Sequence, residues 1–118
     1  TRKESSAASD VYKRQQQQVL GFFALKGDFL CREIQQLTEK RNWQITDQYC
    51  CGGYAKTTPE LLQFIRTFEQ QYNIPLEQIY TGKMLLGLID LIQQGTFPKD
   101  HRILVIHSGG LQGRLATL

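Results

Sequence analysis

The chain has 118 residues, which is enough for one domain of ordinary size and too few for two. Its hydrophobic fraction of 41% argues against disorder, and no apolar run approaches the length needed to span a bilayer. The net charge is +3, and four of the basic residues lie within the first fourteen positions, so the nearly neutral remainder gives no electrostatic reason to expect nucleic acid or a membrane as a partner.

Residues 1–15 are polar and show no periodicity, and they run into a stretch of glutamines. We predict a disordered tail or a non-native leader here, because the segment SSAASDVYKRQ resembles a peptide encoded by translated sequencing-adapter DNA. In the second case, residues 16–118 are the downstream part of a longer protein.

The next segments alternate between strand and helix. The continuous apolar run at residues 19–25 predicts a strand buried on both faces, as in a parallel sheet. A helix over residues 29–41, capped by Asp28, is predicted to follow. Alternating apolar residues then predict a second strand over residues 43–49.

Two longer helices are predicted after these strands. Thr57 and Glu60 match a capping box, and Pro59 suits the first turn, where its missing N–H is not needed. This helix is expected to end at residues 73–75, which read Asn-Ile-Pro. The second helix, over residues 81–94, is so apolar that we expect it to be largely buried.

Residues 103–106 are all apolar and predict a third strand buried on both faces. The alternation of strands and helices is typical of an α/β fold with parallel layering, that is, a three-layer arrangement around a parallel sheet. Three such strands with few elements to cover them predict exposed sheet edges and exposed apolar faces. The simplest interpretation is an incomplete sheet that belongs to a larger domain.

Ligands of open α/β sheets bind beyond the carboxyl ends of the strands. Glycine-containing segments lie there at residues 50–54 and 107–110, and residues 80–83 enter a helix, so that their backbone N–H groups can face a polar ligand. Glycine pairs after strands more often serve turns. On these residues alone the chain is either part of an enzyme or a non-enzymatic α/β domain that binds a small anion or a partner.

Residues 52–113 resemble the C-terminal part of the 1-aminocyclopropane-1-carboxylate deaminase and D-cysteine desulfhydrase family, and residues 19–30 resemble the strand and helix start before it. The most specific motifs are YTGKM at 80–84, FPK at 97–99 and HSGG at 107–110, in the family's order and spacing. The resemblance implies a pyridoxal-phosphate enzyme of fold type II, similar to tryptophan synthase β, with a small amino acid as substrate and a homo-oligomeric state. Residues 16–118 would then be the C-terminal part of the cofactor-binding domain.

Two tyrosines are the catalytic candidates that this resemblance implies. Tyr80 matches a family tyrosine beside the cofactor ring that takes part in proton or nucleophile chemistry, and Tyr54 matches a second active-site tyrosine in the loop after a strand. Phenols beside a cationic group can have lowered pKa values, which suits proton transfer. Without the resemblance, Tyr54 is a packing loop aromatic and Tyr80 a half-buried residue at a helix start.

Four further residues are assigned to the cofactor by the resemblance: Ser108 near the pyridine nitrogen, Gly109 and Gly110 beside the flat ring, and Thr81. The deaminase members carry a glutamate at the position of Thr81 and a leucine at that of Ser108, so the two hydroxyl residues are similar to the desulfhydrase branch. A neutral hydroxyl draws fewer electrons from the ring than a charged partner does. We therefore expect α,β-elimination from D-cysteine, giving pyruvate, ammonia and sulfide, in preference to opening of the cyclopropane.

The family's Schiff-base lysine lies in an N-terminal segment that this chain does not match. Lys83, within YTGKM, has no such role in the family, and we expect it to be a solvated or structural residue, as we do Lys26 and Lys56. These 118 residues by themselves are therefore expected to lack lyase or deaminase activity and to bind pyridoxal phosphate weakly or not at all.

The cysteines and histidines indicate no metal site. Cys31, Cys50 and Cys51 are an odd number without CxxC spacing, which argues against a disulfide framework and for a reducing, cytoplasmic location. His101 and His107 lack a partner at ligand spacing. We expect His107 to be a hydrogen-bonded neighbour of the site, and the two adjacent cysteines to be buried and inert.

Overall fold

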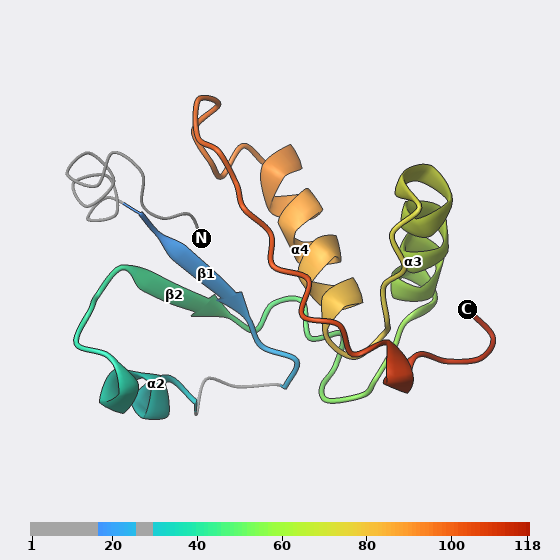
Figure 1. The fold of residues 1–118 in the computed structure, drawn as a ribbon, viewed down its shortest axis with the longest axis horizontal. Helices are drawn as coiled ribbons and strands as arrows, with labels where there is room; N and C mark the ends of the chain where they lie inside the picture. The colour runs from blue at the N-terminus through green and yellow to red at the C-terminus, as the bar shows by residue number, and fades with distance from the viewer. Residues whose placement is uncertain (1–16, 26–29) are drawn as a thin grey trace.

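The computed structural model describes residues 17–25 and 30–118 (Figure 1). The predicted leader, the capping residue Asp28 and Lys26 lie outside the described residues. In chain order, the elements are strand β1 (Val19–Phe22), helix α2 (Cys31–Leu37), strand β2 (Trp43–Thr46), helix α3 (Pro59–Tyr72), helix α4 (Thr81–Gln93) and the short 3-10 helix η1 (Leu111–Gly113).

β1 and β2 pair in parallel, with Val19 opposite Trp43 and Phe22 opposite Thr46. Both strands begin where the sequence predicts and are shorter than predicted. Helix α2 is also shorter than its predicted range, and none of its residues is buried. Parallel pairing of two strands that are connected through a helix confirms the predicted α/β class.

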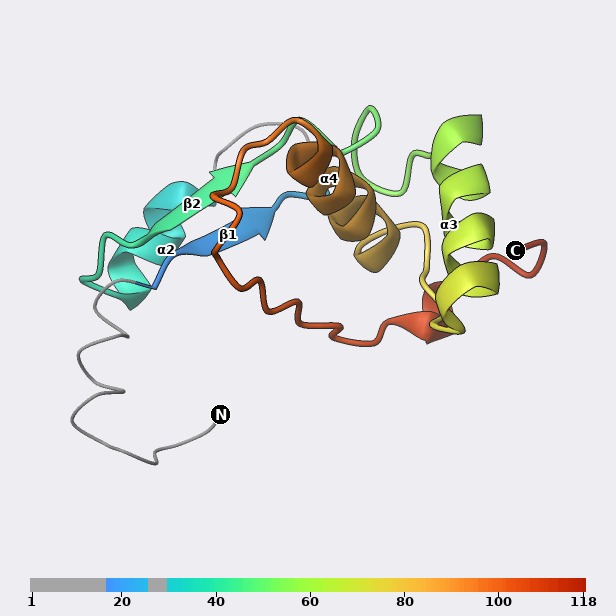
Figure 2. The same ribbon diagram turned by 90° about the horizontal axis from the view of Figure 1, so that it is seen from above.

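The core lies between the two long helices. Leu61 and Ile65 of α3 pack with Leu85 and Leu88 of α4, and Leu76 from the connection between them completes this cluster. Helix α4 also contacts β1, so it stands between the sheet and α3 (Figure 2). None of the helices in the described ranges is long and apolar enough to cross a membrane.

Helix α3 begins one residue later than the predicted capping box implies. Thr58 is the N-cap, and its hydroxyl accepts a hydrogen bond from the Leu61 N–H at 3.1 Å. A residue before proline is driven into extended conformations, which the N-cap requires, so Pro59 selects Thr58 over Thr57. The capping box built on Thr57 is therefore wrong, whereas the predicted end of the helix is confirmed by Asn73, which is left-handed with φ 58°.

Residues 103–106 form no strand, so the predicted third strand is wrong. Within the described residues the sheet consists of β1 and β2 alone, and segment 103–106 has no ladder partner there. Its apolar side chains face solvent as a result: Leu104 is 89% exposed and Ile106 73% exposed. The expectation of exposed apolar surface is confirmed by these residues.

Helix α4 approaches its neighbours closely at Gly82. A Cβ there would lie 2.5 Å from the Glu77 carbonyl oxygen and 2.6 Å from Cδ1 of Ile65. We expect Gly82→Ala to lower the free energy of unfolding by about 2 kcal/mol, because the clash with a backbone oxygen outweighs the helix propensity that alanine adds. Urea unfolding measures the loss.

The matched control for this substitution is Gly113→Ala. A Cβ at Gly113 would make an ordinary contact of 3.7 Å with Cδ1 of Ile79, so this variant is expected to be nearly as stable as the parent. Equal stability of the two variants would mean that α4 can move away from Glu77 at little cost.

Candidate active site

Tyr54 and Tyr80 meet from separate parts of the chain. Tyr54 lies in the loop after β2, and Tyr80 directly precedes α4. Their hydroxyl oxygens are 3.1 Å apart, and their rings meet edge to face with centroids 6.1 Å apart. Both side chains are about half exposed, so this hydrogen-bonded pair of phenols is open to a ligand. The structure thus brings the two predicted catalytic residues together, while their catalytic roles stay a prediction.

The two phenols border a cavity of about 500 Å³. Its other walls are apolar and come from the end of β1, the residues after it and the start of α2: Phe22, Phe23, Ala24, Leu25 and Leu30. The size is in the range of sites for small molecules and cofactors. The cavity lies beyond the carboxyl end of β1, which is where ligands of open α/β sheets bind.

The pKa of Tyr80 is raised above its usual value of 10.0, first by its hydrogen bond with Tyr54 and then by desolvation and by the negative charge of Glu77. The lowered pKa expected beside a cationic cofactor is therefore not what the chain's own groups produce. A tyrosine is protonated at neutral pH even at its ordinary pKa, and the raised pKa makes the Tyr80 phenol harder to deprotonate, which disfavours a role as a base.

A buried carboxylate holds the backbone that carries Tyr80. The side-chain oxygens of Glu77, which is fully buried, accept hydrogen bonds from the backbone N–H groups of Ile79, Tyr80 and Thr81 at 2.6–2.9 Å. The Gly82 N–H is bonded to the Glu77 carbonyl at 2.8 Å. Of the N–H groups at residues 80–83 that the sequence offers to a ligand, those of Tyr80, Thr81 and Gly82 are thus bonded within the chain. Glu77 was not predicted from the sequence, although an acidic residue just before a helix is a known signal for such bonds.

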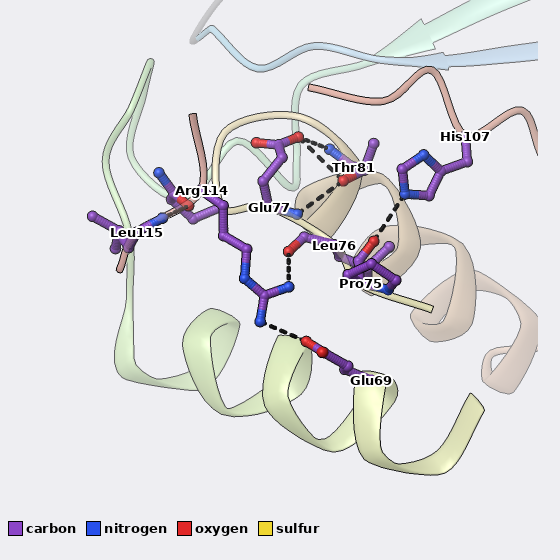
Figure 3. A network of polar contacts seen from close by, with 9 residues as sticks. Glu69, Pro75, Leu76, Glu77, Thr81, His107, Arg114 and Leu115 are labelled. Atoms are coloured by element: carbon purple, nitrogen blue, oxygen red, sulfur yellow. Dashed lines mark hydrogen bonds and ion pairs between the residues drawn. The ribbon is translucent and has the colours of Figure 1, made fainter. Parts of the chain in front are cut away.

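Thr81 uses its hydroxyl inside the same network (Figure 3). The hydroxyl donates to the Glu77 carboxylate at 3.1 Å and accepts from the Glu77 backbone N–H at 3.0 Å, and the residue is only 2% exposed. Thr81 therefore stabilises the turn that leads into α4. Its predicted part in binding the cofactor stays a prediction.

The loop Ser108-Gly109-Gly110 passes close to this turn. A Cβ on Gly110 would lie 3.6 Å from the Glu77 Oε1, whereas a Cβ on Gly109 would meet no atom within 4 Å. Both glycines have positive φ, and Ser108 is exposed. The loop is thus linked to the Tyr80 segment through Glu77, with open space at Gly109.

His107 fixes the loop to the segment before α4. Its Nε2 donates to the Pro75 carbonyl at 2.9 Å, and its Nδ1 accepts from the Gly109 N–H at 3.1 Å (Figure 3). The two bonds require the neutral tautomer with its proton on Nε2. His107 is hydrogen-bonded, as predicted, while its place as a neighbour of the site stays a prediction.

The chain after this loop braces the same segment from the other side. Arg114 donates to the Leu76 carbonyl at 3.0 Å and forms an ion pair with Glu69 of α3 (Figure 3). Gln78 donates to the Gly113 carbonyl at 2.8 Å. Residues 107–115 therefore hold the backbone on which Tyr80 is placed.

The predicted lysines and cysteines differ in their exposure to solvent. Lys56 is exposed, as predicted. Lys83 is 1% exposed, so of the two predicted alternatives, solvated or structural, it is not the solvated one. Cys50 is buried, and burial raises the pKa of the Cys51 thiol, which disfavours a reactive thiolate. Lys83 reaches the loop of Tyr54 because its side chain extends away from α4 toward Gly53.

Known proteins with related sequences point in one direction. The chain is 42% identical over 65 residues to a protein of Pyrococcus horikoshii named as a 1-aminocyclopropane-1-carboxylate deaminase. The matched stretch covers 55% of this chain and 19% of that relative. The chain is also 35% identical over 75 residues to a D-cysteine desulfhydrase of Klebsiella pneumoniae. This match covers 64% of this chain and 23% of that enzyme. This stretch of the chain is related to the 1-aminocyclopropane-1-carboxylate deaminases and D-cysteine desulfhydrases. No protein-family model matches it.

The fold agrees with this relationship to the deaminases and desulfhydrases. A crystal structure described as that of an ACC deaminase homologue superimposes with a TM-score of 0.62 at 26% identity, over 68% of this chain and 28% of that one. The predicted assignment to part of a fold type II α/β domain is thereby confirmed. The chain spans about a fifth of the length of the curated relatives it matches.

Proposed function

We propose that this chain supplies the phenol pair of a pyridoxal-phosphate-dependent lyase that acts on a small amino acid. The observation that carries the proposal is the 3.1 Å contact between the Tyr54 and Tyr80 hydroxyls at the border of an apolar cavity. Two phenols from distant parts of a chain rarely need to share a hydrogen bond at an exposed position for stability alone, because water satisfies exposed hydroxyls equally well.

The residues present fit one side of the cofactor. Gly109 offers open space for a flat ring, and Ser108 is an exposed hydroxyl that can partner the ring nitrogen. The N–H groups of Tyr80 and Thr81 at the start of α4 are not offered to the cofactor phosphate, because Glu77 already accepts from them. Pyridoxal phosphate, when bound, supplies a conjugated ring that withdraws electrons from the substrate's Cα.

The chain's own contribution is a proton held at the Tyr80 oxygen. Elimination from D-cysteine breaks the Cα–H and Cβ–S bonds. The Cα proton passes to a base, and the sulfur departs as hydrosulfide, which becomes hydrogen sulfide when it takes up a proton. A phenol that is protonated at neutral pH can donate that proton, and Tyr54 can orient it through their shared hydrogen bond. Phe22 and Phe23 give the cavity beside this phenol pair apolar walls.

The surroundings of Thr81 support a desulfhydrase rather than a deaminase specificity. Its hydroxyl lies 3.1 Å from the buried Glu77 carboxylate. A glutamate at position 81, as in the deaminase members, would place a second carboxylate against the first, and two buried like charges repel strongly. The site is thus built for a neutral hydroxyl at this position.

The decisive experiment measures pyruvate released from D-cysteine and from 1-aminocyclopropane-1-carboxylate by the complete gene product that carries this stretch. We expect pyruvate from D-cysteine and none from the cyclopropane. The 118 residues alone are expected to give none from either substrate, because the lysine that anchors the cofactor in the family lies outside the matched stretch. The reverse substrate preference would overturn the assignment.

A further inference from the structure

The largest fully buried side chain of the described residues is a lysine. Lys83 lies in the first turn of α4 and is 1% exposed. Burial lowers its pKa, which means that the folded chain disfavours the charged form. The start of a helix is also the positive end of its dipole, so the position is unfavourable for a cation in two ways. A residue that costs stability in this way calls for another reason to be there.

The Lys83 ammonium makes one hydrogen bond to the loop that carries Tyr54. Its Nζ donates to the Gly53 carbonyl at 3.0 Å. The same carbonyl already accepts the backbone N–H of Lys56 at 3.1 Å, so it would be satisfied without the lysine. The bond is therefore not needed to rescue a buried acceptor, and its effect must lie in where it holds the loop.

The bond joins the backbone positions from which the two phenols extend. Lys83 is three residues after Tyr80, and Gly53 is directly before Tyr54. Two hydrogen bonds thus connect the segment of Tyr80 and α4 with the loop of Tyr54. One joins Lys83 to the Gly53 backbone, and the other joins the two hydroxyls at the ends of the tyrosine side chains.

The loop itself needs such a restraint. Cys51, Gly52, Gly53 and Ala55 all have positive φ, from 56° to 138°, and the two that are not glycine are in a conformation that side chains disfavour. Two further contacts anchor the start of this region: the Tyr49 hydroxyl donates to Asp90 at 2.6 Å, and Cys51 packs against the core cluster. Both lie before Gly53, whereas the Lys83 bond acts at the residue directly before Tyr54.

We propose that Lys83 is a positioning residue that sets the contact between the Tyr54 and Tyr80 hydroxyls by holding the Gly53 carbonyl against the first turn of α4. Its consequence for catalysis rests on the proposed function. The geometric claim does not, since it concerns only the two rings and the lysine between their backbones.

The test replaces Lys83 with methionine in the 118-residue chain, because methionine fills similar space without a charge or a donor. Replacing a buried charge with an apolar side chain is often neutral or stabilising. We therefore expect unfolding by urea to be unchanged or shifted to higher concentration, together with loss of the NOE cross-peaks between the assigned rings of Tyr54 and Tyr80. A residue that only supports the fold would give the opposite pattern, with lower stability and retained cross-peaks.

The matched control is Lys56→Met, which removes an exposed lysine from the same loop and leaves the backbone bond of Lys56 intact. It is expected to keep the ring–ring cross-peaks. If Lys83→Met does not give a folded amide spectrum, Lys83→Leu takes its place, because leucine is apolar and has no donor for the Gly53 carbonyl. Retained cross-peaks in either folded Lys83 variant overturn the proposal.

In the complete enzyme, Lys83→Met is expected to lower kcat for D-cysteine by about 10- to 100-fold with little change in KM, as misplacement of a reacting group does. Activity on D-cysteine tests the proposed function, whereas the ring–ring cross-peaks test the positioning role of Lys83. An enzyme without activity on D-cysteine contradicts the proposed function while the ring contact still tests the role of Lys83. An active enzyme whose kcat is unaffected by the substitution contradicts the positioning role.

Discussion

Replacing Tyr80 with phenylalanine is expected to lower kcat for D-cysteine by at least about 100-fold in the complete enzyme, the range seen when a group that transfers a proton is removed. The change deletes only the phenol oxygen, so the ring that packs against Tyr54 stays in place. KM should change little, because the lost interaction is made with the departing group rather than with the bound substrate. Steady-state rates of pyruvate formation measure both constants.

The control for Tyr80→Phe is Tyr72→Phe, which removes a phenol oxygen of similar exposure from the end of α3, outside the cavity lining. It should leave kcat unchanged. The pKa of Tyr80 is raised above 10.0, so a step that uses the protonated phenol slows only as the pH rises through that value, and Tyr80→Phe should lack this decline. An unaltered kcat in Tyr80→Phe would remove this residue from the reaction.

Replacing Glu77 with glutamine is expected to lower the free energy of unfolding by about 3 kcal/mol, because hydrogen bonds to a buried charged acceptor are among the most costly to lose. The carboxylate accepts from the backbone of Ile79, Tyr80 and Thr81, and glutamine would turn one acceptor oxygen into an NH2 group that faces these donors. Urea unfolding of the 118-residue chain gives the difference.

Glu69→Gln serves as the matched control for Glu77→Gln. Glu69 is 39% exposed and pairs only with Arg114 among the bonds described, so its loss is expected to cost less than about 1 kcal/mol. Similar losses for the two variants would show that the turn before α4 does not depend on the buried carboxylate.

Local sequence signals predicted α3 and the parallel strand pair because their causes lie within a few residues. Pro59 and the threonine before it define the helix start, and Asn73 defines its end through a left-handed conformation. The error of one residue at the cap arose because two adjacent threonines offer the same side chain. Only the backbone preference imposed by the proline distinguishes them.

The features that the sequence did not predict depend on contacts between distant residues. A lysine in a first helical turn is normally solvated, and the burial of Lys83 follows from a loop thirty residues earlier in the chain. Residues 103–106 have the composition of a buried strand, yet a strand also needs a neighbour, and composition does not supply one. The meeting of Tyr54 with Tyr80 was expected from the resemblance alone, since no periodicity links them.

The hydrogen bonds between residues 113–114 and the segment before α4 affect the order in which this chain folds during translation. The bonds that Gln78 donates to the Gly113 carbonyl and Arg114 donates to the Leu76 carbonyl span 35 and 38 residues, so they join parts of the polypeptide that are made at different times. While α3 and α4 can form their contact as soon as both have emerged from the ribosome, the turn that carries Tyr80 has its local bonds to Glu77 but lacks these two bonds until residues 107–115 have been translated. The phenol pair should accordingly be among the last features of this chain to mature.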